Sequence, residues 1–244
     1  MKRGVDKSII QELQKQIFRL QGNQQSDLQQ PVLGLGPIEY AFPNNAFPRG
    51  AIHELISSNP ESAASTNGFL SVLLNALIQQ NGSCLWISTR RTIFPPSLKA
   101  FNIEPDRILF VDVLDVKDAL WAMEEALKCN ALTAVIGEFT ALSFDESRRL
   151  QLAVEQSKVT GFIHRFKPKV ENTVACVSRW KITPLFSETP DQLPGVGFPK
   201  WNVELIKARN GKPGSWQVQW SPQGLTYIEK EEFAIPKIYT RSTA

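Results

Sequence analysis

The chain has 244 residues, of which 42% are hydrophobic, so it can build a substantial core in one large domain or two small ones. Its 27 basic and 24 acidic residues leave a formal charge of only +3. This balance excludes a protein that binds nucleic acid through overall charge alone, and any such contact must come from a local patch.

Membrane and metal signals are also missing from the sequence. No apolar run approaches the roughly 18 residues that a membrane helix needs, and the N-terminus has no signal-like apolar core. Cys84, Cys129 and Cys176 lie far apart beside apolar segments, which predicts buried free thiols. We therefore expect a cytoplasmic protein without a metal site.

Residues 1–33 are expected to form a segment of their own. Apolar residues at intervals of three and four predict an amphipathic helix over residues 6–21, and residues 22–33, rich in Gln, Asn and Ser, predict a flexible linker. A tethered helix can bury its apolar stripe on its own core or on a neighbouring molecule. The stripe that would contact a partner consists of Ile9, Leu13, Ile17 and Leu20.

The stretch from Ser57 to Thr66 matches the spacing of a phosphate-binding loop without its chemistry. It lies between an apolar run at 51–56, typical of a strand, and a helical apolar pattern at 69–78. A working loop reads G-x-x-x-x-G-K-[ST], because glycines let backbone N–H groups wrap the phosphates and lysine neutralises them. Of these residue types only the final hydroxyl remains. The degenerate loop would comprise Asn59, Pro60, Glu61, Ser62, Ala63, Ala64, Ser65 and Thr66.

Strand and helix signals alternate from residue 50 to about residue 169. Apolar runs at 84–87, 108–113, 131–136 and 161–165 predict strands. Asp115 and the pair Ser143 and Glu146 predict the caps of two helices, and Trp121 and Met123 are expected to pack in the core from the first of them. Helices that repeatedly connect strands imply a mostly parallel sheet covered on both faces.

The last third of the chain has a different pattern. Residues 173–182 alternate as a strand does, and residues 201–205 and 216–220, joined by an Asn-Gly turn region, predict an antiparallel hairpin. The sheet should therefore gain antiparallel strands at one edge. Residues 34–220 form the expected α/β domain, and residues 221–244 are predicted to be an extended or disordered tail.

Several segments resemble one family. The runs Trp121–Leu127, Gly137–Glu138, Arg148–Ala153, Ser178–Trp180 and Trp201–Trp220 are similar, in order, to those of the ImuA family, and Phe47–Leu55 resembles the entry to the core of RecA-type recombinases. ImuA proteins are RecA-like and are encoded in bacterial DNA-damage mutagenesis cassettes. The resemblance implies a RecA-like fold and a role in damage-induced mutagenesis.

Compared with RecA, the expected nucleotide site has lost its reactive groups. Ser65 stands in place of the phosphate-binding lysine, and Arg90 falls where the resemblance places the glutamate that activates water. Glu138 occupies the place of the aspartate that helps to hold magnesium. These changes argue against hydrolysis and against a bound cofactor. We further hypothesise that Arg90 and Glu138 form an ion pair that closes the empty site.

A basic cluster surrounds the position of RecA's second DNA-binding loop, which is short in this chain. Such a cluster can hold a phosphate backbone weakly, or it can be a solvated basic edge. Its members are Arg165, Lys167, Lys169, Arg179 and Lys181.

These observations favour a non-catalytic adaptor in error-prone translesion DNA synthesis. The resemblance implies contact with an ImuB-type, polymerase-like protein and with RecA, at the nucleoid. The alternatives are an atypical ATPase or DNA-binding repair protein, and an interaction protein of the cell-division-inhibitor type. His53 and His164, the only histidines, have no triad-like neighbours and are expected to be structural.

Overall fold

The computed structural model describes residues 33–78, 82–187, 189 and 196–228. The strands are β1 (Ile52–Ser57), β2 (Ser83–Ser88), β3 (Ile108–Asp112), β4 (Leu132–Phe139), β5 (Thr160–Phe166), β6 (Ser178–Leu185), β7 (Lys200–Ala208), β8 (Gly214–Ser221) and β9 (Gly224–Tyr227). The helices are α2 (Pro60–Ile78), α3 (Val116–Lys128) and α4 (Phe144–Ser157), with short 3-10 turns η1 (Gly36–Ala41), η2 (Pro43–Asn45), η3 (Pro95–Phe101) and η4 (Pro105–Arg107). The predicted helix at 6–21 lies outside the described residues.

One sheet of nine described strands runs through the molecule in the order β3-β2-β4-β5-β1-β6-β7-β8-β9. The neighbours from β3 to β6 are parallel, and those from β6 to β9 are antiparallel. Both the predicted α/β fold and the antiparallel strands at one edge are therefore confirmed. No helix in the described part of the chain is long and apolar enough to cross a membrane.

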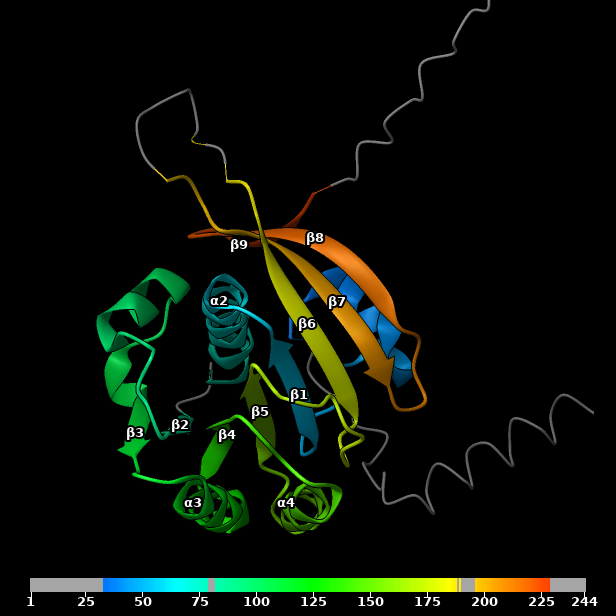
Figure 1. Cartoon of the computed structure of the whole chain (residues 1–244). Helices are drawn as coiled ribbons and strands as arrows, with labels where there is room; N and C mark the ends of the chain where they lie inside the picture. The colour runs from blue at the N-terminus through cyan, green and yellow to red at the C-terminus, as the bar shows by residue number, and fades with distance from the viewer. Residues whose placement is uncertain (1–32, 79–81, 188, 190–195, 229–244) are drawn as a thin grey trace, which may run out of the picture.

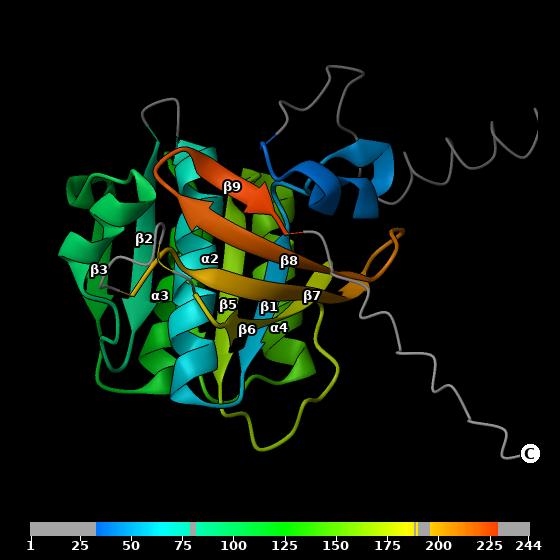
Figure 2. The ribbon, with the colours of Figure 1, turned by 90° about the horizontal axis from the view of Figure 1, so that it is seen from above.

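Helices cover both faces of the parallel strands (Figure 1). α2 packs on one face, where Phe69 and Trp180 lie 6.0 Å apart between ring centroids, and α3 and α4 pack on the other. Strands β6 to β9 curve around α2, so Trp201 and Val203 of β7 join the same core as α2 (Figure 2). The hairpin thus adds a wall to the α2 side of the molecule.

The predicted helix caps are confirmed. The Asp115 carboxylate accepts hydrogen bonds from the N–H groups of Lys117 and Asp118 at the start of α3. Ser143 and Glu146 form the capping box of α4, each side chain accepting from the other's backbone N–H. These caps satisfy donors that a helix start leaves without intrahelical partners.

β6 begins later than its alternating pattern predicts. The strand starts at Ser178 rather than at residue 173, and residues 174–177 are buried in an irregular segment. Their backbone is bound elsewhere, because Ala175 N–H donates to Ser147 Oγ on α4 and Val177 N–H donates to the Ile52 carbonyl on β1. These hydrogen bonds to α4 and β1 replace the strand pairing that the alternating sequence pattern predicted for this segment.

The sheet extends beyond Trp220 through β9, a strand that the sequence analysis placed in the tail. β9 pairs with β8 and ends at Tyr227. The Tyr227 hydroxyl donates to the Leu35 carbonyl and accepts from the Ile38 N–H at 3.2 Å. Residues 33–41, for which the sequence analysis predicted no helix or strand, are thereby fixed to the sheet, with Leu35 and Ile38 fully buried.

Candidate functional site

The stretch expected to be a phosphate-binding loop is helical from Pro60 onward. β1 ends at Ser57, so only Ser58 and Asn59 connect it to α2. Asn59 caps the helix, its Oδ1 accepting from the Ser62 N–H at 2.7 Å and its carbonyl accepting from the Ala63 N–H at 3.0 Å. Proline suits the first helical turn, and the stretch contains no glycine that would allow a wrapped loop. These N–H groups bind within the chain instead of facing an anion.

The hydroxyl that would remain for a metal is also occupied. Thr66 is fully buried, and its Oγ1 lies 2.8 Å from the Ser57 Oγ at the end of β1. Ser57 Oγ in turn lies 2.9 Å from Nε2 of His164 on β5. Ser65, in the lysine position, is 5% exposed, and its hydroxyl donates to the Glu61 carbonyl. The site is filled by a chain of neutral hydrogen bonds.

Both histidines have the structural roles that the sequence analysis expected. His53 stacks on Phe47 with 4.4 Å between ring centroids, and its ring nitrogens contact Ser178 Oγ and the Pro48 carbonyl. Burial lowers the pKa of His53 and of His164 to about 4, so both rings are neutral at pH 7. His164 Nδ1 is buried without a partner among the described residues, so no carboxylate orients that ring as in a catalytic triad.

The hypothesised pair of Arg90 and Glu138 does not form in the structure. Glu138 Oε1 accepts from Trp86 Nε1 at 2.8 Å and from the Thr92 hydroxyl at 3.5 Å, and burial raises the pKa of its carboxyl group. Arg90 is exposed beyond the end of β2. No ion pair joins the two among the described residues.

The arginine that does pair at this edge of the sheet is Arg91. Its Nη2 lies 2.6 Å from Oδ2 of Asp112, the last residue of β3. Ser88, the last residue of β2, is in register with Asp112, so β3 brings this carboxylate beside the chain that leaves β2. The sequence analysis chose Arg90 because the resemblance to RecA placed that residue at the position of the catalytic glutamate.

The predicted basic cluster divides into buried and exposed members. Arg165 on β5 is 2% exposed, and its Nη1 lies 2.9 Å from Oε1 of Glu54 on β1. Arg179 on β6 places its Nε 2.5 Å from the other oxygen of Glu54. Because β1 lies between β5 and β6, one fully buried carboxylate reaches both arginines. These two guanidinium groups therefore do not face outward as phosphate contacts.

The same arginines hold the connection between β5 and β6. Arg165 Nη2 donates to the Val170 carbonyl at 2.9 Å, and Arg179 Nη2 donates to the Asn172 carbonyl at 2.7 Å. The lysines of the cluster lie outside this arrangement. Lys181 pairs with Glu171 at 3.0 Å, whereas the side chains of Lys167 and Lys169 are exposed.

A cleft of about 580 Å³ lies beside the first turns of α2, at the carboxyl end of β6. In open α/β sheets ligands bind at this edge. Its lining comprises the α2 face from Glu61 to Ser71, the segment from Thr92 to Phe101, and the facing ends of β6 and β7. No group of acidic, His and Cys side chains that could hold a metal ion occurs in the described chain.

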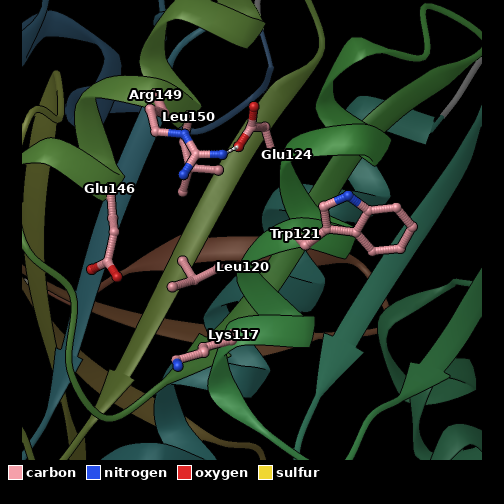
Figure 3. A pocket seen from close by; sticks show the side chains of 7 residues that line it. All are labelled: Lys117, Leu120, Trp121, Glu124, Glu146, Arg149 and Leu150. Atoms are coloured by element: carbon pink, nitrogen blue, oxygen red, sulfur yellow. Dashed lines mark hydrogen bonds and ion pairs between the residues drawn. The ribbon is translucent and has the colours of Figure 1, made fainter.

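A second, smaller hollow of about 140 Å³ lies between α3 and α4 (Figure 3). Arg149 of α4 pairs with Glu124 of α3 across it, and Leu120 and Leu150 contribute apolar lining. Trp121 is 66% exposed on α3, so its predicted place in the core is wrong. Two residues along a helix rotate a side chain by roughly 200°, which turns Trp121 away from the face that buries Met123.

Comparison with curated proteins gives the family. The chain is 32% identical over 208 residues to Protein ImuA of Caulobacter vibrioides, in two strains, and the match covers 80% of this chain and 85% of the relative. The chain belongs to the ImuA family. It is also 26% identical over 138 residues to the cell division inhibitor SulA of Photorhabdus laumondii, which covers 53% of this chain and 78% of that protein. No family model matches the chain.

For this member of the ImuA family, residue matching alone missed Glu54 and the cleft. Glu54 lies inside an apolar run, and a carboxylate in a buried strand requires a partner. The need of a buried carboxylate for a positively charged partner was the signal available in the sequence. It predicts that an arginine or a lysine lies close to Glu54 in the folded protein. The cleft has no comparable signal, because its lining comes from segments up to 140 residues apart, from Glu61 to Trp201.

The free thiols of Cys84 and Cys176 are buried as expected, but Cys129 is exposed.

Proposed function

We propose that the protein is a non-catalytic, RecA-like adaptor in damage-induced, error-prone translesion DNA synthesis at the nucleoid. It assembles with an ImuB-type, polymerase-like protein and contacts RecA. Membership of the ImuA family supports the process. The observation that carries the non-catalytic part is the helix that begins at Pro60, because it replaces the loop that would wrap a phosphate.

A nucleotide titration tests the non-catalytic part. A fluorescent ATP analogue with Mg²⁺ should show no saturable binding at micromolar concentrations. The double substitution Ala64→Gly with Ser65→Lys restores the missing residue types, yet it should not restore binding, because Thr66 stays bonded to Ser57. Saturable binding by the unmodified chain would favour the atypical ATPase instead.

A capture experiment tests the adaptor part. A tagged full chain, expressed in cells with damaged DNA, should retain a polymerase-like protein, and a chain lacking residues 1–31 should retain less of it. The truncation stops before Leu33, whose N–H donates to the buried Glu39 carboxylate at 2.9 Å, so the core should keep its thermal stability. Equal capture by both chains would refute a partner role for the Ile9, Leu13, Ile17 and Leu20 stripe.

The proposal also includes weak, direct contact with single-stranded DNA. Lys167 and Lys169 are exposed, whereas Arg165 and Arg179 are bound to Glu54. Binding to single-stranded DNA should therefore be weak and salt-sensitive. A Lys167→Glu, Lys169→Glu double variant should abolish it, and Lys212→Glu with Lys117→Glu provides a charge-matched control. If the control variant lost the same binding, the contact would be non-specific.

Similarity to SulA supports a second candidate, an interaction protein that inhibits cell division. Overproduction in undamaged bacterial cells distinguishes the two. Filamentous growth would support the inhibitor, whereas normal division together with capture of a polymerase-like protein supports the adaptor.

A further inference from the structure

The cleft beside α2 has a rigid aromatic wall. Phe101 stacks on Trp201 and on Trp220, with 6.3 Å and 5.8 Å between ring centroids. The Trp220 indole N–H also donates to the Ala100 carbonyl at 2.8 Å, which fixes this wall to η3. Phe94, seven residues before Phe101 in the same lining segment, is 68% exposed. A surface of preordered aromatic rings binds an apolar side chain with little loss of conformational entropy.

The floor of the cleft is formed by α2, open at Ala64 and covered by Trp201 at Gly68. Ala64 and Gly68 lie one turn apart on it. A Cβ added to Gly68 would lie 2.6 Å from the Trp201 ring, so this glycine allows the wall to approach the helix. The exposed Ala64 leaves the cleft open toward the start of α2. The resulting space can receive a side chain of leucine or arginine size.

The first turn of α2 gives one end of the cleft a negative charge. Glu61 is exposed in the first turn of α2, and no ion pair to it occurs in the described chain. A second carboxylate, Glu138, lies behind Thr92, which lines the cleft. Lys200 is the one cation among the described lining residues, and it already has a partner. A polyanion such as a nucleotide would meet Glu61 first, whereas a guanidinium group could pair with it and stack on Phe94.

We infer that this cleft docks a segment of a partner protein in which an arginine adjoins an apolar residue. The apolar side chain lies on Ala64 beside the Trp201 ring, and the arginine lies over Phe94 toward Glu61. This inference rests on the proposed adaptor function only for the existence of a protein partner. Its chemistry follows from the cleft, which combines aromatic and apolar lining with the Glu61 carboxylate at one end.

Binding of a labelled peptide to the full chain tests the inference. The probe is a fluorescein-labelled peptide of sequence Gly-Ser-Leu-Arg-Leu-Ser-Gly, with Arg replaced by Glu in the comparison peptide. The Arg peptide should raise the fluorescence anisotropy in a saturable way and shift the backbone amide signal of Gly68, and the Glu peptide should bind roughly tenfold more weakly or not at all. Equal affinity for the two peptides, or no saturable binding, would overturn the inference.

Matched variants locate the contact. Glu61→Arg should weaken the Arg peptide roughly tenfold, whereas Asp118→Arg, an acidic residue exposed in the first turn of α3, should leave it unchanged. Ala64→Trp should block the cleft, and Gln156→Trp, at an exposed position of α4, provides its control. Loss of binding in both members of a pair would show that the peptide binds elsewhere.

The same variants separate this inference from the proposed function. If Glu61→Arg and Ala64→Trp still captured the polymerase-like protein and the Arg peptide did not bind, the adaptor role would stand and the cleft inference would fail. If the Arg peptide bound at Gly68 but no partner were captured from damaged cells, the cleft inference would stand without the proposed function.

Discussion

β1 buries polar side chains on both of its faces, and the two faces satisfy them in different ways. Toward α2, His53 and Ser57 are held by neutral hydrogen bonds to Ser178, Thr66 and a second histidine. On the opposite face, Glu54 forms ion pairs with two arginines. The neutral face fills the position of the expected nucleotide site, whereas the charged face holds the β5–β6 connection. The buried ion pairs of β1 therefore lie on the face opposite to the one where phosphate chemistry would need charge.

Removing the carboxylate from the charged face should have the largest effect. Glu54→Gln keeps the side-chain volume but leaves Arg165 and Arg179 without a counter-charge, and Arg165 is 2% exposed. We expect the free energy of unfolding to fall by about 3–5 kcal/mol. Urea denaturation followed by circular dichroism measures it.

The exposed pair of Glu171 and Lys181 provides the control. Glu171→Gln should cost no more than about 1 kcal/mol, because solvent screens an exposed ion pair. If Glu54→Gln and Glu171→Gln lowered the free energy of unfolding by similar amounts, burial would not make the Glu54 ion pairs more stabilising than an exposed pair.

Acid should act on the neutral face through the histidines. The pKa of His164 is about 4 in the folded protein, against about 6.5 when unfolded, so the unfolded state binds more protons between these pH values. Stability is therefore full above pH 6.5 and falls as the pH decreases toward 4. His164 should account for about 3 kcal/mol of this loss at pH 4.

A histidine variant isolates that contribution. His164→Gln cannot take up a proton in this range, so its free energy of unfolding should decrease less between pH 7 and pH 4 than that of the unmodified protein. Parallel pH curves for the two proteins would show that His164 is not buried in its neutral form.

Of the three buried polar groups of β1 and its neighbours, the hydroxyl chain should have the smallest effect. Thr66→Val keeps the shape but removes one partner of Ser57, and it should cost about 1–2 kcal/mol. Ser65→Ala, one residue earlier on the same helix, removes only a bond to the Glu61 carbonyl and should change stability by less than about 0.5 kcal/mol. An equal effect of the two changes in urea denaturation would show that the chain through Ser57 adds nothing.

Much of the fold could be predicted because its signals are local. Short apolar runs such as 84–87 predict the buried strands, and Ser143 with Glu146 predicts the start of α4 from four consecutive residues. Residues 59–66 were expected to form a loop because they were compared with a phosphate-binding motif. Their own signals, an Asn-Pro start and no glycine, favour the helix that forms.

The candidate sites were harder to predict because they depend on strand order. Arg165 and Arg179 lie 14 positions apart in the sequence and resemble one basic cluster with the lysines. Only the insertion of β1 between β5 and β6 brings them to Glu54 and removes them from the surface. The exposure of Trp121, by contrast, follows from helical geometry that the sequence already contained.

Tyr227 joins the two ends of the described chain, since its hydroxyl contacts Leu35 and Ile38. Topologically, residues 33–228 therefore form an almost closed ring. A short linker between those ends should permit a circular permutant opened at the Asn210 and Gly211 turn, which lies between β7 and β8. Such a rearranged protein would separate the order of the elements along the chain from their arrangement in space.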